Sequence, residues 1–284
     1  MGRIQRSWAL AKQSYLVLKA QPQLAFFPII SGIATVIVGI SFFLPMVLTG
    51  SYHQGERPSP FHYAVMFAFY AISSFVVIFF NAGLVSCAYE ALNGRPTDWR
   101  SGLANAGKHL GAIVIWSLIA ATVGTILRYI GERTGFVGQL VVGLLGFAWS
   151  LLTYFVVPVI VIESSMPVPA LKKSGGMLKN SWGDRIVANI GIGTATGLLM
   201  AVAVIPVAIG ISLFIAGLWP LGLVALGLAC LYLLFVTVIS TTLGGIFNTA
   251  LYIYASTGQV PTGFSEEYLK DAFRLKKQSK MWAS

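Results

Sequence analysis

Residues 218–255, LWPLGLVALGLACLYLLFVTVISTTLGGIFNTALYIYA, contain no Asp, Glu, Lys, Arg or His. The charge-free stretch around them extends over residues 186–265. A helix of about 20 apolar residues crosses the roughly 30 Å hydrocarbon core of a bilayer, so this segment is long enough to span a membrane. The whole chain has the same character, since 56% of its 284 residues are hydrophobic and only 10% are charged. Soluble proteins average about 25% charged residues, so this composition excludes an ordinary water-soluble enzyme and a disordered chain.

Outward from this segment, five more apolar runs reach membrane-spanning length. The six predicted spans cover residues 24–48, 61–92, 110–130, 136–162, 186–214 and 218–255. Backbone amides in lipid must be hydrogen-bonded within their own segment, which favours helices. The predicted fold class is therefore all-α, a polytopic bundle that forms a single membrane domain over residues 1–284. Its predicted parts are an N-terminal amphipathic helix (1–21), a six-span bundle (24–255) and a basic cytoplasmic tail (256–284).

The distribution of Lys and Arg predicts the orientation of the spans. Of the 19 Lys and Arg residues, 16 fall in the N-terminal segment, the loops after the second and fourth spans, and the C-terminal tail. Cytoplasmic loops of membrane proteins carry an excess of Lys and Arg. Both termini are therefore predicted to be cytoplasmic, in a multi-pass protein of the inner (cytoplasmic) membrane.

Three of the basic segments have the pattern of amphipathic surface helices. The first has an apolar stripe that consists of Ile4, Trp8, Ala11, Tyr15 and Leu18. Its basic residues, such as Lys12 and Lys19, are predicted to lie largely away from that stripe. Anionic headgroups attract Lys and Arg by about 1 kcal/mol per residue near the surface. The residues expected to contact anionic phospholipid are Arg3, Arg6, Lys12, Lys19, Arg100, Lys108, Lys172, Lys173 and Lys179.

Each surface helix precedes an odd-numbered span, which suggests three repeated units of a surface helix and a transmembrane hairpin. Residues 79–97 resemble residues 246–262, with Asn81 matching Asn248. Chance matches between apolar helices are the alternative to a true internal repeat.

Several boundary motifs resemble those of known membrane proteins. They are RSWALAKQS (6–14) before FPIISG (27–32), PVIVIESSMPVPALKKSGGMLKNSW (158–182) and ALYIYASTGQVPTGF (250–264). These motifs are similar to those of uncharacterised bacterial six-span proteins of the YciC-like group, and to the membrane domain attached to some glycerophosphodiester phosphodiesterases. The resemblance implies a membrane fold and a link to lipid. The phosphodiesterase activity is not implied, because the soluble catalytic domain is missing.

Polar residues inside the spans are few, and two interpretations of them stay open. Desolvating an unpaired amide costs a few kcal/mol, so each such group needs a partner or water. The candidates to line a hydrated cavity are Asn81, Asn248, Ser240, Thr241, Thr242 and Thr249; the alternative is hydrogen bonding between packed helices. Glu90 and Glu163 lie near the predicted cytoplasmic ends of the second and fourth spans. They could form a carboxylate ring at an inner mouth, pair with the nearby Arg95 or Lys172, or simply be hydrated.

The sequence shows no recognisable catalytic site. His53, His62 and His109 are isolated, and no serine or cysteine has a recognisable base and orienting group. We therefore expect no enzymatic activity, no catalytic residue, no metal and no cofactor. Nucleic acid is not an expected partner, because the orientation of the spans already accounts for the net charge of +10. A homo-oligomer is compatible with the glycine-rich spans.

Two functions remain as hypotheses. The first is a passive channel or carrier for an ion, a small solute or a lipid, because the spans contain polar Asn, Ser and Thr but lack the charges that coupled pumps use. The second is a non-transporting scaffold or assembly partner that binds anionic lipid through its basic surface helices.

Overall fold

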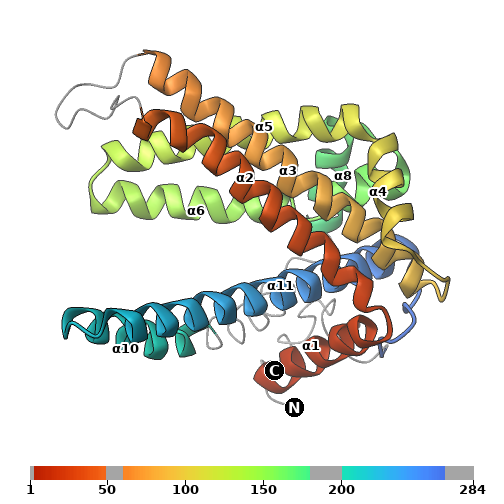
Figure 1. Ribbon diagram of the computed structural model, residues 1–284. Coiled ribbons are helices and arrows are strands. Elements are labelled where there is room, and N and C mark those ends of the chain that lie inside the picture. The colour runs from red at the N-terminus through yellow and green to blue at the C-terminus, as the bar shows by residue number, and fades with distance from the viewer. Residues whose placement is uncertain (1–2, 49–59, 180–199, 266–284) are drawn as a thin grey trace, which may run out of the picture. The chain divides into compact units, whose positions relative to one another are not determined.

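The computed structural model describes residues 3–48, 60–179 and 200–265, and all regular secondary structure in those ranges is helical (Figure 1). The predicted all-α class is therefore confirmed. The elements are α1 (Arg3–Ala20), the 3₁₀ helix η1 (Pro22–Ala25), α2 (Phe26–Leu48), α3 (Pro60–Leu92), α4 (Trp99–Lys108), α5 (Leu110–Arg133), α6 (Phe136–Leu152), α7 (Val156–Glu163), α8 (Pro167–Lys179), α10 (Val204–Ile215) and α11 (Trp219–Thr257).

Five of the helical segments in the described ranges are long and apolar enough to cross a membrane. They are Pro22–Pro45, Tyr63–Leu92, Leu110–Arg133, Phe136–Glu163 and Trp219–Thr257. These segments match five of the six predicted spans. At 1.5 Å per residue, the 39 residues of α11 extend over about 58 Å, well beyond the hydrocarbon thickness of a bilayer.

The predicted span over residues 186–214 is the one that the structure supports only in part. Residues 186–199 lie outside the described residues, and the described remainder is the shorter apolar helix Met200–Ile215. The six-span count and the threefold repeat therefore remain predictions.

The predicted span over residues 136–162 is divided into two helices, α6 and α7. The interruption lies at Thr153–Phe155, before Pro158. Pro158 lies in the first turn of α7, where a missing N–H removes no helical hydrogen bond. Ser174 of α8 joins the two helix ends, because its hydroxyl donates to the carbonyl of Leu152 at 2.7 Å and accepts from the N–H of Phe155 at 3.1 Å.

The chain divides into two compact units. The middle unit comprises residues 26–180, and the terminal unit comprises residues 1–25 and 181–284. In the middle unit, α3 contacts α2, α4, α5 and α7, while α8 contacts α5, α6 and α7. The large side chains buried in this unit include Phe27, Leu84, Ile113, Phe155 and Ile160.

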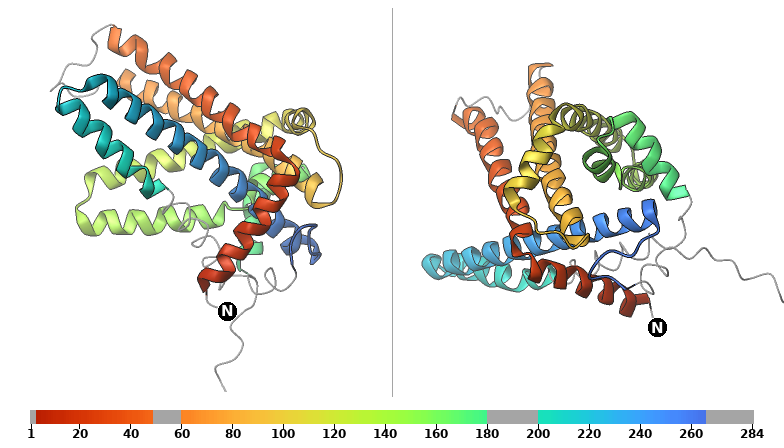
Figure 2. Two further views of the ribbon diagram at one scale, coloured as in Figure 1. Left: turned by 60° about the horizontal axis from the view of Figure 1, so that its bottom comes forward. Right: turned by 90° about the vertical axis from the view of Figure 1, so that its right-hand side faces the viewer.

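The terminal unit is built on a hairpin of α10 and α11. The two helices approach closely at Gly210 and Gly222, since a Cβ on Gly222 would lie only 2.9 Å from the carbonyl oxygen of Gly210. Helix α1 and η1 contact α11 within the same unit, and Figure 2 shows α1 beside the C-terminal part of α11. This packing determines which face of α1 is buried.

Candidate functional site

Helix α1 has a buried and an exposed face. Leu10, Ser14, Val17 and Leu18 are buried, whereas 65% of Trp8 and 50% of Tyr15 are exposed. The buried residues recur at the three- and four-residue intervals of one helix face. The exposed aromatic rings therefore lie on the side of α1 that the terminal unit leaves uncovered.

The exposed face of α1 alternates aromatic and basic residues. Trp8, Lys12, Tyr15 and Lys19 are spaced by four, three and four residues, and all four are exposed. At 100° per residue, these positions fall within a sector of about 60°. We call these four residues the α1 face. Lys12 and Lys19 therefore lie beside the aromatic half of the predicted apolar stripe, whereas Leu18, which belongs to that stripe, is buried. The reason is that α1 packs against α11 through one face, and this buried face contains neither Trp8 nor Tyr15.

The segment after α11 returns along α1. The Gln13 side chain donates from Nε2 to the Ser265 hydroxyl at 2.8 Å, and the Ser265 N–H donates to Gln13 Oε1 at 3.5 Å. Gly263, with a φ of 86°, lies close to Val17, since a Cβ there would be 3.1 Å from Val17 Cγ2. The described end of the chain, at Ser265, therefore lies next to α1.

The remaining predicted lipid contacts are distributed over three helices. Arg100 and Lys108 of α4 are exposed, and the Arg100 guanidinium lies 5.4 Å from the Trp99 ring centroid. Lys172 and Lys173 of α8 are exposed as well. Arg3 and Arg6 lie in α1 and Lys179 ends α8, but their side chains are outside the described part of the structure.

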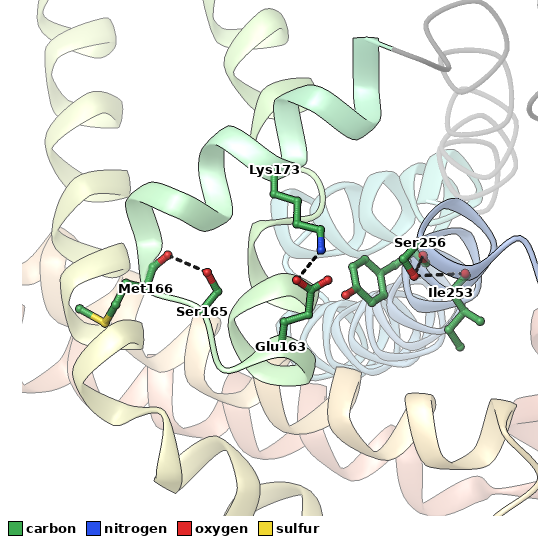
Figure 3. A network of polar contacts seen from close by, with 7 residues as sticks. Glu163, Ser165, Met166, Lys173, Ile253 and Ser256 are labelled. Carbon is green, nitrogen blue, oxygen red and sulfur yellow. Dashed lines mark hydrogen bonds and ion pairs between the residues drawn. The ribbon is translucent and has the colours of Figure 1, made fainter.

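The two predicted carboxylates each have a basic partner. Glu90 pairs with Arg95 at 2.9 Å, as one of the two interpretations predicted. Glu163 pairs with Lys173 at 2.6 Å rather than with Lys172, and Figure 3 shows the two groups facing each other between α7 and α8. Both contacts favour pairing over a carboxylate ring.

The predicted cavity residues belong to two different units. Asn81 lies in α3 of the middle unit, whereas Asn248, Ser240, Thr241, Thr242 and Thr249 lie in α11 of the terminal unit. Thr242 and Thr249 are buried, and their hydroxyls donate to the carbonyls of Val238 and Gly245 one turn earlier, at 2.7 and 2.8 Å. These hydroxyls are satisfied without water, so a hydrated cavity stays a prediction.

The structure brings together one pair of residues that the sequence analysis missed. His109 lies at the joint of α4 and α5, and Ser164 follows α7. Nε2 of His109 is 3.0 Å from the Ser164 hydroxyl, and Nδ1 is 2.8 Å from the carbonyl oxygen of Asn105. The Asn105 side chain in turn donates to the Ser86 hydroxyl at 2.8 Å. The two residues are 55 positions apart, and the sequence has no local motif that pairs them.

A helical chain with five segments of membrane-crossing length is compatible with the class of integral membrane proteins. A model of the family described as "Family of unknown function (DUF6159)" matches residues 61–264, and the chain belongs to this family. The match covers α3 through the segment after α11, including His109 and Ser164, and does not connect the chain to the YciC-like or glycerophosphodiesterase groups. A search of curated proteins found no match.

Proposed function

We propose that this protein is a membrane-embedded scaffold that binds anionic phospholipid at the cytoplasmic surface through the α1 face. The observation that carries the proposal is the alternation of Trp8, Lys12, Tyr15 and Lys19 on one exposed side of α1. Trp and Tyr favour the headgroup region of a bilayer, because one part of each ring is apolar and the other is polar. Lysines between them place positive charge at the same depth.

The charges of the α1 face support an external anionic partner. Among the described residues, no carboxylate pairs with Lys12 or Lys19, whereas Lys173 is already paired with Glu163. The sequence also has no acidic residue before Glu56. A phosphate headgroup would therefore meet two lysines for which no described carboxylate competes.

The packing of α1 also supports the proposal. Its opposite face is fixed in the terminal unit by Leu10, Val17 and Leu18, and by the Gln13–Ser265 hydrogen bonds. A helix held in this way presents its exposed side chains without having to fold on binding, which lowers the entropic cost of the contact.

The test compares two charge variants of the full chain in detergent. The double variant Lys12→Gln/Lys19→Gln should bind phosphatidylglycerol about 30-fold more weakly, since two lysines contribute about 1 kcal/mol each. The matched control Lys12→Arg/Lys19→Arg keeps both charges and should bind as the parent protein does. Binding is measured as the rise in melting temperature with added phosphatidylglycerol, compared with phosphatidylcholine. An equal response of both double variants would contradict the proposal.

The passive pathway for an ion, solute or lipid remains the second prediction. Reconstituted protein that releases a trapped dye or moves a labelled lipid between leaflets would support it, whereas lipid binding without such flux would favour the scaffold alone.

A further inference from the structure

The contact between His109 and Ser164 has the geometry of a base beside a nucleophile. The ring nitrogen Nε2 lies 3.0 Å from the hydroxyl oxygen, which is within hydrogen-bonding distance. A serine hydroxyl becomes a useful nucleophile when a base accepts its proton and a third group orients that base. His109 and Ser164 supply the first two of these components.

The carbonyl of Asn105 supplies the third component. It lies 2.8 Å from Nδ1 of His109, and a carbonyl oxygen can only accept a hydrogen bond. Nδ1 therefore carries the proton in the neutral ring, which leaves Nε2 as an acceptor for the Ser164 O–H. The side chain of Asn105 is fixed by its hydrogen bond to Ser86, so the helix turn that carries the carbonyl is anchored to α3.

The backbone at Ser164 adds an independent observation. Its φ is 52°, and among the described residues it is the one non-glycine residue with a positive φ. Such conformations cost about 1–3 kcal/mol and cluster at functional sites. Ser164 is exposed, so a substrate can reach its hydroxyl.

Donors for a developing oxyanion lie directly after Ser164. In the described part of the chain, the N–H groups of Ser165 and Met166 have no acceptor. Figure 3 shows that the Ser165 hydroxyl is turned towards the Met166 carbonyl, to which it donates. In known serine hydrolases, the N–H of the residue after the nucleophile contributes to the oxyanion hole.

From this geometry we infer that Ser164 and His109 form a catalytic dyad for the hydrolysis of carboxylic esters. The substrate class is an amphiphilic ester, because the dyad lies at the ends of helices of membrane-crossing length, where headgroups and ester carbonyls of lipids are found. Lys108, which directly precedes His109 in the sequence, is exposed and favours an anionic headgroup.

The reaction proceeds in two balanced steps. Ser164 Oγ attacks the ester carbonyl while its proton moves to Nε2 of His109, and the bond to the alcohol oxygen breaks as His109 returns that proton to the alcohol. Water then attacks the acyl-serine and gives a proton to Nε2. The acid leaves as Ser164 Oγ regains that proton.

A fluorophosphonate probe tests the dyad in the full-length protein in detergent. Ser164 Oγ should form a bond to phosphorus and release fluoride, giving a stable adduct that mass spectrometry locates at Ser164. His109→Ala should slow this labelling by about a hundredfold or more, as expected for loss of a general base. Ser150→Ala, which removes an exposed hydroxyl of α6, should leave labelling of Ser164 unchanged.

A glycine variant distinguishes loss of the nucleophile from loss of the folded structure. Ser164→Gly removes the nucleophile while the positive φ is retained without strain, so this variant should fold and lose all labelling. A p-nitrophenyl ester of a long-chain acid gives a second readout, whose hydrolysis should be lost in Ser164→Gly. Absence of an adduct at Ser164 in the parent protein, or equal labelling in His109→Ala, would overturn the inference. Lipid binding by the α1 face is independent of this result, because Lys12→Gln/Lys19→Gln should label normally.

Discussion

Gly102 of α4 lies directly against Gly83 of α3. A Cβ on Gly102 would be 2.7 Å from the carbonyl oxygen of Gly83 and 2.8 Å from the Phe27 ring of α2. The three helices therefore meet where two of them have no side chain. This close approach positions α4, whose last turn is followed by His109, against the end of α3.

The first prediction concerns this contact. Gly102→Ala should destabilise the protein by about 1–3 kcal/mol, because backbone atoms of α3 have no room to move away from the new methyl group. Gly107→Ala is the control on the same helix, where a Cβ meets nothing within 4 Å and alanine favours the helix. Thermal unfolding in detergent measures both, and equal melting temperatures for the two variants would contradict the packing at Gly102.

The second prediction concerns the interruption between α6 and α7. Ser174→Ala removes the hydroxyl that joins Leu152 to Phe155 and leaves a buried N–H and a carbonyl without this partner. The expected loss is about 1–3 kcal/mol of unfolding free energy. Ser150→Ala is the matched control, since its exposed hydroxyl bonds only to Phe147 of its own helix. A similar loss of unfolding free energy in both variants would show that the Ser174 hydroxyl does not stabilise the interruption between α6 and α7.

Some helix boundaries could be predicted from the sequence, because the length of an apolar run determines them. The predicted span over residues 61–92 agrees with α3 within one residue, Pro60–Leu92. The helix ends there for a local reason, because Asn93 and Gly94 follow it and Gly94 has a φ of 74°. Apolar length and a helix-terminating glycine are both visible in a single sequence.

The sites were less predictable because they depend on tertiary contacts. The spacing of Trp8, Lys12, Tyr15 and Lys19 was available in the sequence, but two competing stripes on α1 have helical periodicity. Only the packing against α11 determines which of them is buried. The pairing of His109 with Ser164 has no sequence signal, because the two residues come from different helix joints that the fold of the middle unit brings together.

The third prediction tests backbone strain at Ser164 through stability. Ser164→Gly should leave the melting temperature nearly unchanged, because relief of about 1 kcal/mol of strain offsets the loss of one hydrogen bond of about 1 kcal/mol. Ser164→Val should be clearly destabilised, since a β-branched residue tolerates a positive φ poorly. Valine behaving like glycine in thermal unfolding would rule out the left-handed conformation.

The fourth prediction concerns the salt dependence of lipid binding by the α1 face. Screening lengths fall from about 10 Å at 0.1 M salt to about 3 Å at 1 M, so attraction between exposed lysines and headgroups weakens over this range. The parent protein should therefore lose affinity for phosphatidylglycerol vesicles as salt rises. Lys12→Gln/Lys19→Gln should lose less affinity over the same range, so that the affinities of the two proteins become equal near 1 M salt. Trp8→Ala instead removes apolar contact with the bilayer. Its lower affinity for the vesicles should persist at high salt, because salt does not screen hydrophobic burial. Parallel salt curves for the parent and the lysine variant, measured by vesicle-dependent shifts in melting temperature, would mean that Lys12 and Lys19 do not face the headgroups.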